Sequence, residues 1–202
     1  MSATATRNVN VLFFGPPGAG KGTQADLVAP RLRLAHVSTG DMFRQFAAEG
    51  TPLGLEVKAI MEAGHYVPDE TTVTMLRELL TTLRASQPEL RGVIFDGFPR
   101  TPEQVPALDA FLRTRDERVD AVVYLTVKLE VLLPRLLARG RTDDSTDTIT
   151  TRFDKYETAT APLIAEYEQR GTPIYRINGD QAMEQVTADV VAALSPLFAG
   201  RE

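Results

Sequence analysis

A glycine-rich segment that directly follows an apolar run constrains this chain more than any other feature. Residues 10–23 read Asn-Val-Leu-Phe-Phe-Gly-Pro-Pro-Gly-Ala-Gly-Lys-Gly-Thr. Glycines leave backbone N–H groups open to a polyanion, and the helix that follows directs its unpaired N–H groups and positive dipole end to the same place. Lys21 adds a full positive charge. The pattern predicts a phosphate-binding loop between a buried strand and a helix, rather than a tight turn without a ligand.

The residue after the lysine departs from the strict phosphate-loop motif. That motif has Ser or Thr directly after the lysine, whereas here Gly22 intervenes and Thr23 follows. The sequence alone therefore leaves open whether the Thr23 hydroxyl contacts a magnesium ion.

Composition excludes several other classes of protein. The 202 residues, 43% of them hydrophobic, fit one globular domain over 1–202, and the net charge of -5 argues against general binding to nucleic acid or anionic membranes. With no cysteine there is no disulfide, no thiolate nucleophile and no cysteine zinc site. We find neither a signal peptide nor an apolar run near the roughly 18 residues that a membrane span needs. We therefore expect a cytoplasmic protein.

Apolar strands alternate with amphipathic helices along the whole chain. Strands are expected to end near residues 14, 37, 96, 126 and 178, and helices over 21–34, 128–139, 148–170 and 181–198. This alternation predicts an α/β fold, a five-stranded parallel sheet with helices on both faces. Shorter helices over 40–68 are read as a helical insert. Lys21, Thr39, Asp96 and Arg100 follow strands, so they should converge at the carboxyl edge of the sheet.

Arginines accumulate after the fourth strand. Arg135 and Arg139 are four residues apart on one helical face, Arg141 follows Gly140, and Arg152 lies in the next helix. They could form a solvated face paired with nearby aspartates. The phosphate loop favours phosphate binding instead. His36 and His65 belong to no nucleophile motif, so we expect them to be structural or peripheral, and no covalent machinery is evident. Phosphoryl transfer by positioning and electrostatics remains.

Three segments now carry a resemblance to a known family. Residues 15–24 (GPPGAGKGTQ), 36–44 (HVSTGDMFR) and 95–101 (FDGFPRT) resemble, in order, the three signatures of the adenylate kinases, which are nucleoside monophosphate kinases. The resemblance implies a three-layer fold like that of P-loop nucleoside triphosphate hydrolases. It also implies reversible transfer between ATP plus AMP and two ADP, with Mg²⁺ and as a monomer.

The resemblance also implies how the chain is divided into parts, and it places the chain among the short-lid members of the family. The core would comprise 8–39, 69–138 and 148–198, with 40–68 as the monophosphate-binding insert and 139–147 as a short lid. A zinc-binding lid is not expected, because the chain has no cysteine. Both 40–68 and 139–147 are expected to close over the substrates, which excludes water.

The resemblance assigns roles to individual residues. Asp96 would orient magnesium through water, and the remaining positions fall into three overlapping groups. The catalytic positions are Lys21, Arg100, Arg139, Arg141 and Arg152. The ATP-binding positions are Gly18, Ala19, Gly20, Lys21, Gly22, Thr23, Arg135, Arg139 and Gln181. The AMP-binding positions are Thr39, Arg44, His65, Tyr66, Val67, Gly97, Phe98, Pro99, Arg100, Gln104, Arg141 and Arg152, with Gln104 reading the adenine edge.

Two alternatives stay open from the sequence. One is a UMP/CMP kinase of the same fold, although that group usually has alanine where this chain has Thr39 and a different sequence at 101–104. The other is a nucleotide-binding regulatory module without turnover, which the short lid suggests and the arginine set disfavours.

Overall fold

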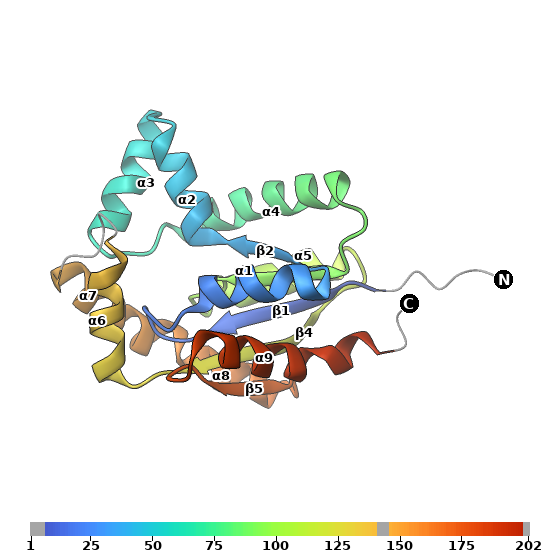
Figure 1. The fold of residues 1–202 in the computed structure, drawn as a ribbon. Coiled ribbons are helices and arrows are strands. Elements are labelled where there is room, and N and C mark those ends of the chain that lie inside the picture. The colour runs from blue at the N-terminus through green and yellow to red at the C-terminus, as the bar shows by residue number, and fades with distance from the viewer. Residues whose placement is uncertain (1–6, 141–145, 200–202) are drawn as a thin grey trace.

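The computed structural model describes residues 7–140 and 146–199. Within these residues five strands form a parallel sheet in the order β2-β3-β1-β4-β5 (Figure 1). The strands are β1 (Val9–Phe14), β2 (Ala35–Ser38), β3 (Gly92–Asp96), β4 (Val119–Thr126) and β5 (Ile174–Asn178). The predicted fold class is confirmed. Because β1 lies between β3 and β4, the loop that leaves β1 emerges beside Asp96, whose register partner is Phe13.

Helices cover both faces of the sheet. One face packs against α1 (Lys21–Leu32) and α9 (Met183–Leu194), and the other packs against α4 (Asp69–Ser86), α5 (Gln104–Arg113) and α8 (Pro162–Gln169). In β1 every residue is buried, since Val11 and Phe13 pack toward α1 and α9 while Leu12 and Phe14 pack toward α5 and α8. Apart from Asn10, whose side-chain amide donates to Glu117 at 3.0 Å, the strand is apolar, as a parallel sheet covered on two sides requires.

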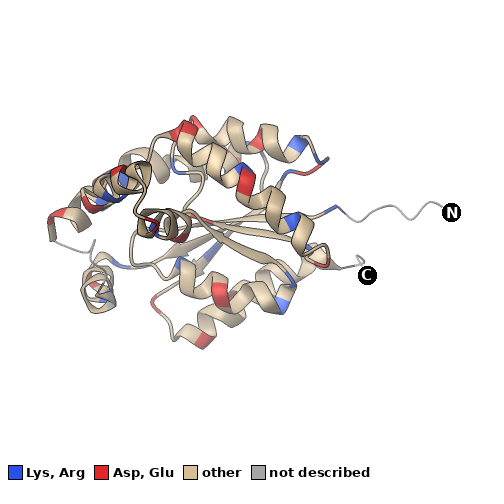
Figure 2. Cartoon of the chain, turned by 90° about the horizontal axis from the view of Figure 1, so that it is seen from above, with Lys and Arg blue, Asp and Glu red and all other residues tan. Residues whose placement is uncertain are grey.

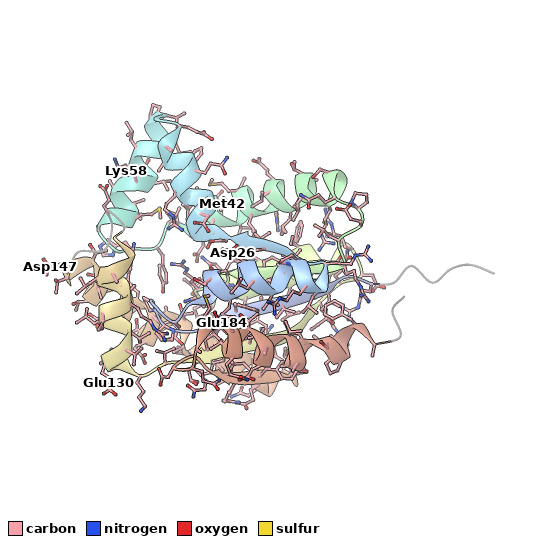
Figure 3. All side chains as sticks on the ribbon, viewed as in Figure 1. Asp26, Met42, Lys58, Glu130, Asp147 and Glu184 are labelled. Atoms are coloured by element: carbon pink, nitrogen blue, oxygen red, sulfur yellow. The ribbon has the colours of Figure 1, made fainter. Side chains whose placement is uncertain are left out.

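Two helices project from the carboxyl end of the sheet, away from the chain termini (Figure 1). They are α2 (Thr39–Ala48) and α3 (Pro52–Glu62), and a small apolar cluster of Phe43, Val57 and Val67 holds them together. The hydroxyl group of Thr148 donates to the carbonyl of Glu62 at 2.9 Å, which ties this unit to α7 (Thr146–Lys155). Figure 3 shows α3 and α7 at the same end of the molecule, where the label Lys58 marks α3 and the label Asp147 marks α7.

Two predicted helices end or change form earlier than the periodicity indicated. The first ends at Leu32 rather than Leu34, because Arg33 adopts a left-handed conformation with φ 56°. The helix predicted over 148–170 is divided into α7, the π turn η1 (Tyr156–Thr160) and α8. Pro162 has no N–H group to continue the ladder, and the N–H of Ala161 bonds to the carbonyl of Tyr156, five residues back.

Two further helical elements follow strand β4 and helix α9. They are α6 (Leu129–Arg139), which follows β4, and the short 3-10 turn η2 (Ser195–Phe198), which closes α9. Charged residues lie mainly in helices and loops, and the central strands contain few of them (Figure 2). In the parts of the chain that the structure describes, no helix has the length and apolar character to cross a membrane.

Candidate active site

A cavity of about 590 Å³ opens at the carboxyl edge of the sheet. Its lining combines segments that are far apart in sequence: the loop after β1, the start of α2, the end of the insert, the turn after β3, and parts of α6, α7 and η1. All residues from Gly18 to Thr23 line it, as do Thr39, Arg44, His65, Tyr66, Val67, Asp96, Gly97, Pro99, Arg100, Gln104, Arg135, Arg152 and Gln181. The structure thus brings most of the predicted site residues together.

One predicted residue lies away from the cavity, and the side chains of two others fall outside the described part of the structure. Phe98 is 2% exposed and packs in the core on the α4 and α5 face, so its side chain points away from the cavity. Arg139 is the last residue of α6, and its side chain lies outside the described part of the structure. Arg141 and most of the predicted lid over 139–147 also lie outside the described residues.

The phosphate loop wraps around its own lysine. Nζ of Lys21 donates to the carbonyls of Gly15 at 2.7 Å and Pro16 at 3.1 Å. Gly18 has φ +83°, and a Cβ there would lie 3.0 Å from Cγ of Leu136. Only glycine suits both that backbone conformation and that close approach. Gly20 caps α1, so the first N–H groups of the helix face the cavity.

Asp96 ends β3 beside this loop. Burial alone would raise the pKa of its carboxyl group, but His36, Lys21 and Arg100 together lower the pKa below its usual value. The group is therefore an anion at neutral pH. Gly22 lies against it, since a Cβ at residue 22 would be 3.3 Å from Oδ2 of Asp96. A carboxylate therefore faces the first turn of α1, where phosphates would bind.

His36 has a closer relation to the site than the sequence suggested. Its Nδ1 lies 2.7 Å from Oδ1 of Asp26, and its Nε2 lies 3.6 Å from Oδ2 of Asp96. Burial alone would lower the pKa of His36, but the two carboxylates outweigh it and raise the pKa. His36 pairs with Ile94 in the sheet, so it shares a face with Asp96, two residues further along β3. The sequence gives no strand order, and this neighbour relation could not be predicted from it.

Two side chains anchor the turn that follows β3. The hydroxyl of Thr39 donates to the carbonyl of Gly97 at 2.8 Å, and Nε of Arg100 donates to the same oxygen at 2.7 Å. The guanidinium of Arg100 lies over the Tyr66 ring, 5.1 Å from its centroid. Arg100 is therefore held between the core and the end of the insert.

Gln104 is buried at the bottom of the cavity, with 2% exposure. Its Oε1 accepts from the backbone N–H of Arg100 at 2.7 Å, and its Nε2 donates to Oδ1 of Asp69 at 2.6 Å. Asp69 also accepts from the hydroxyl of Thr101 at 3.0 Å. Sequence reasoning missed Asp69, because it lies 35 residues before Gln104 in a different helix.

The remaining polar groups line other parts of the cavity. Arg44 pairs with Asp41 in the first turn of α2. The guanidinium of Arg135 donates twice to the carbonyl of Gly179, at 3.0 Å each. Gln181 donates to the carbonyl of Asn178 at 3.0 Å. Positive charge thus reaches the cavity from α1, α2, the turn after β3, α6 and α7, which suits a ligand with several phosphate groups.

Comparison with known proteins agrees with this geometry. The family model described as "Adenylate kinase" matches residues 13–172. A protein named adenylate kinase from a Nocardioides species is 44% identical over 92% of this chain and 97% of its own length. The adenylate kinase of Corynebacterium urealyticum is 41% identical (92% and 99%), and that of Symbiobacterium thermophilum is 37% identical (92% and 98%). The chain therefore belongs to the adenylate kinase family and is a nucleoside monophosphate kinase.

Proposed function

We propose that the protein catalyses the reversible, Mg²⁺-dependent transfer of the terminal phosphoryl group of ATP to AMP, which gives two ADP. The observation that carries this proposal is that two anion-binding groups line the same cavity. The phosphate loop with Lys21 forms one of them. Arg44, Arg100 and Arg152 contribute to the other, next to the buried amide of Gln104.

The donor nucleotide would bind to the phosphate loop. Backbone N–H groups from Gly18 to Thr23 and the positive end of the α1 dipole would hold its phosphates. When phosphates bind, the ammonium group of Lys21 would leave its two carbonyl partners and neutralise charge on the transferred group. Arg135, already oriented by Gly179, would face the same phosphates.

The acceptor nucleotide would bind on the side of the insert. Arg100 and Arg44 would hold its phosphate group with forked donors. Gln104 would form paired hydrogen bonds to the adenine, with its oxygen accepting from the amino group. Thr39, Tyr66 and Val67 would line the space between base and phosphate. With both nucleotides bound, catalysis would consist of in-line positioning and electrostatic stabilisation.

The donor set fits magnesium. Mg²⁺ keeps several waters and binds through one or two carboxylates plus substrate phosphates, so an extensive protein cage is not needed. Asp96 offers an ionised carboxylate beside the phosphate loop, and it would hold the ion through water. The ion would neutralise charge on the donor phosphates and orient them. Within the described residues, no group of three or more His, Asp or Glu side chains could hold another metal.

We also propose that the insert over 40–68 and the lid over 139–147 close when both substrates bind. The contact between Thr148 and Glu62 already joins the insert to α7, at the residue that directly follows the lid. Closure would exclude water, which protects ATP from hydrolysis. A bisubstrate dinucleotide should protect both segments from proteolysis. Unchanged cleavage at both segments with the inhibitor bound would contradict closure.

The test is a coupled assay of ADP production from ATP with AMP, UMP or CMP as the acceptor, first with magnesium and then with a chelator. Fast, magnesium-dependent turnover with AMP alone would support the proposal. A preference for UMP or CMP would overturn the acceptor assignment but keep the fold. An Arg100→Ala variant should raise the KM for AMP and lower kcat, with Arg113→Ala, an exposed arginine outside the cavity, as the matched control.

A further inference from the structure

Asp69 connects the end of the insert to the base of the cavity. It is the first residue of α4, directly after residues 40–68, and its two carboxylate oxygens have different partners. Oδ1 accepts from Nε2 of Gln104 at 2.6 Å, and Oδ2 accepts from the hydroxyl of Thr101 at 3.0 Å. Asp69 is absent from the residues that line the cavity, whereas Gln104 is among them. Of these two hydrogen-bond partners, only Gln104 lines the cavity, so it is the direct link between Asp69 and a ligand.

The amide of Gln104 is held at both ends by groups that cannot exchange roles. A carboxylate only accepts hydrogen bonds, and the backbone N–H of Arg100 only donates. Rotating the amide by 180° would place an oxygen against Asp69 and an NH₂ group against the N–H of Arg100. Both hydrogen bonds would be replaced by repulsive contacts in a buried position, which is costly. One N–H and one lone pair of the amide remain for a ligand.

We propose that Asp69 is a positioning residue that sets the base selectivity of the acceptor site. By fixing the amide of Gln104, it directs an acceptor oxygen to the 6-amino group of a purine and makes a 6-oxo purine a poor match. This inference rests on the proposed function, in which Gln104 contacts the adenine of AMP. A 6-oxo purine has an acceptor where adenine has a donor, so it would need the rotated amide.

Asp69 also stabilises α4, and the test must separate this simpler role from the positioning of Gln104. A carboxylate in the first turn of a helix stabilises the helix by interacting with its dipole. Glu70 shares this location in α4, and its side chain is exposed. No hydrogen bond joins Glu70 to Gln104 among the described contacts. Glu70→Ala is therefore a matched control for the loss of helix-stabilising charge.

The experiment measures kcat/KM for AMP and for IMP, its 6-oxo counterpart, in wild type, Asp69→Ala, Asp69→Asn and Glu70→Ala. Asp69→Ala should lower the AMP-to-IMP ratio about tenfold and raise the KM for AMP, while the KM for ATP stays unchanged. Asp69→Asn should keep most of the ratio, because its amide oxygen can still accept from Gln104. Glu70→Ala should keep all of it. Asp69→Ser, which retains a residue suited to a helix start, replaces Asp69→Ala if that variant does not fold.

Three outcomes would each overturn the inference about Asp69, and they differ in what they mean for the proposed function. If wild type discriminates and Asp69→Ala or Asp69→Ser discriminates equally well, the inference about Asp69 is wrong and the proposed function stands. If wild type uses AMP and IMP equally, the proposal that Gln104 recognises adenine is wrong. The proposed role of Asp69 is then wrong as well, because it depends on that recognition. A loss of selectivity in Glu70→Ala equal to that in Asp69→Ala would assign the effect to α4 stability and also overturn the inference.

Discussion

The hydroxyl group of Tyr66 lies 3.0 Å from that of Thr160, and the pair joins the end of the insert to the π turn. Thr160 donates its proton to the carbonyl of Arg100 at 2.9 Å, so Tyr66 must be the donor to Thr160. The ring of Tyr66 also lies beneath the guanidinium of Arg100. Arg100 is therefore fixed from its backbone and its side chain by the same two residues.

The first prediction concerns this arrangement. Thr160→Val keeps the shape of the side chain but leaves the carbonyl of Arg100 and the hydroxyl of Tyr66 without a partner. We expect a loss of about 1–2 kcal/mol in the free energy of unfolding and a roughly tenfold higher KM for AMP. Urea unfolding and steady-state kinetics measure the two effects.

A double-mutant cycle isolates the interaction between the two hydroxyl groups. Tyr66→Phe should have a smaller effect than Thr160→Val, because Arg100 keeps its hydrogen bond from Thr160. Combining both changes should cost less than the sum of the single changes. Strict additivity would show that the hydroxyl groups do not interact.

The second prediction concerns Lys21. Lys21→Met removes the ammonium group but keeps the apolar stem, so kcat should fall about 100-fold or more. The fold should remain, since Lys21 is only partly buried and its carbonyl partners lie at the edge of the cavity. Circular dichroism checks the fold and the coupled assay checks kcat. A kcat near that of wild type would contradict the role of Lys21 in transfer.

The fold could be predicted because local patterns and sheet geometry agree. Strands such as β1 are mostly apolar and fully buried, which is typical of a parallel sheet, and the polar residues that follow them must then meet at the carboxyl edge. Lys21, Thr39, Asp96 and Arg100 do meet there. The residue types at strand ends therefore predict where in the fold this cavity lies.

Relations that depend on packing could not be predicted in this way. The approach of His36 to Asp96 requires β2 to lie beside β3, and nothing in the sequence specifies that order. The side chain of Phe98 points into the core because of the local course of the turn after β3, whereas sequence spacing only places the residue in that turn. The π turn at 156–160 adds one residue to a helical turn, which apolar periodicity does not reveal.

The third prediction concerns pH and His36. The folded pKa of His36 lies above its ordinary value of 6.5, so protonation stabilises the fold. This contribution is fully present below about pH 6.5 and is lost as pH rises through the raised pKa. The stability of wild type relative to His36→Asn should therefore be greatest near pH 6 and decline toward pH 9, as measured by urea unfolding.

Asp26 supplies a control for the pH effect. Asp26→Asn removes the exposed carboxylate partner of His36 and leaves Asp96 in place. The pH dependence assigned to His36 should become weaker but should not vanish. A difference between wild type and His36→Asn that rises with pH would contradict the assignment, since it would mean that the neutral imidazole is the form that the fold favours.

The fourth prediction concerns Gly97, whose φ is +80°. A Cβ at this residue would lie 2.7 Å from a guanidinium nitrogen of Arg100 and 2.8 Å from the hydroxyl of Thr39. Gly97→Ala should therefore displace both side chains that anchor the turn, as well as straining the backbone by about 1–2 kcal/mol. We expect kcat/KM for AMP to fall about 100-fold, with little change in the KM for ATP.

A matched control separates strain from displacement. Gly171 has a similar φ of +75°, but a Cβ there would meet no atom within 4 Å. Gly171→Ala should lose similar stability and retain its activity toward AMP. If both alanine variants lost stability equally and neither lost activity, the contacts of Gly97 with Thr39 and Arg100 would not control the acceptor site. A selective loss in Gly97→Ala would instead show that the absence of a side chain at residue 97 lets the two anchors converge on its carbonyl oxygen.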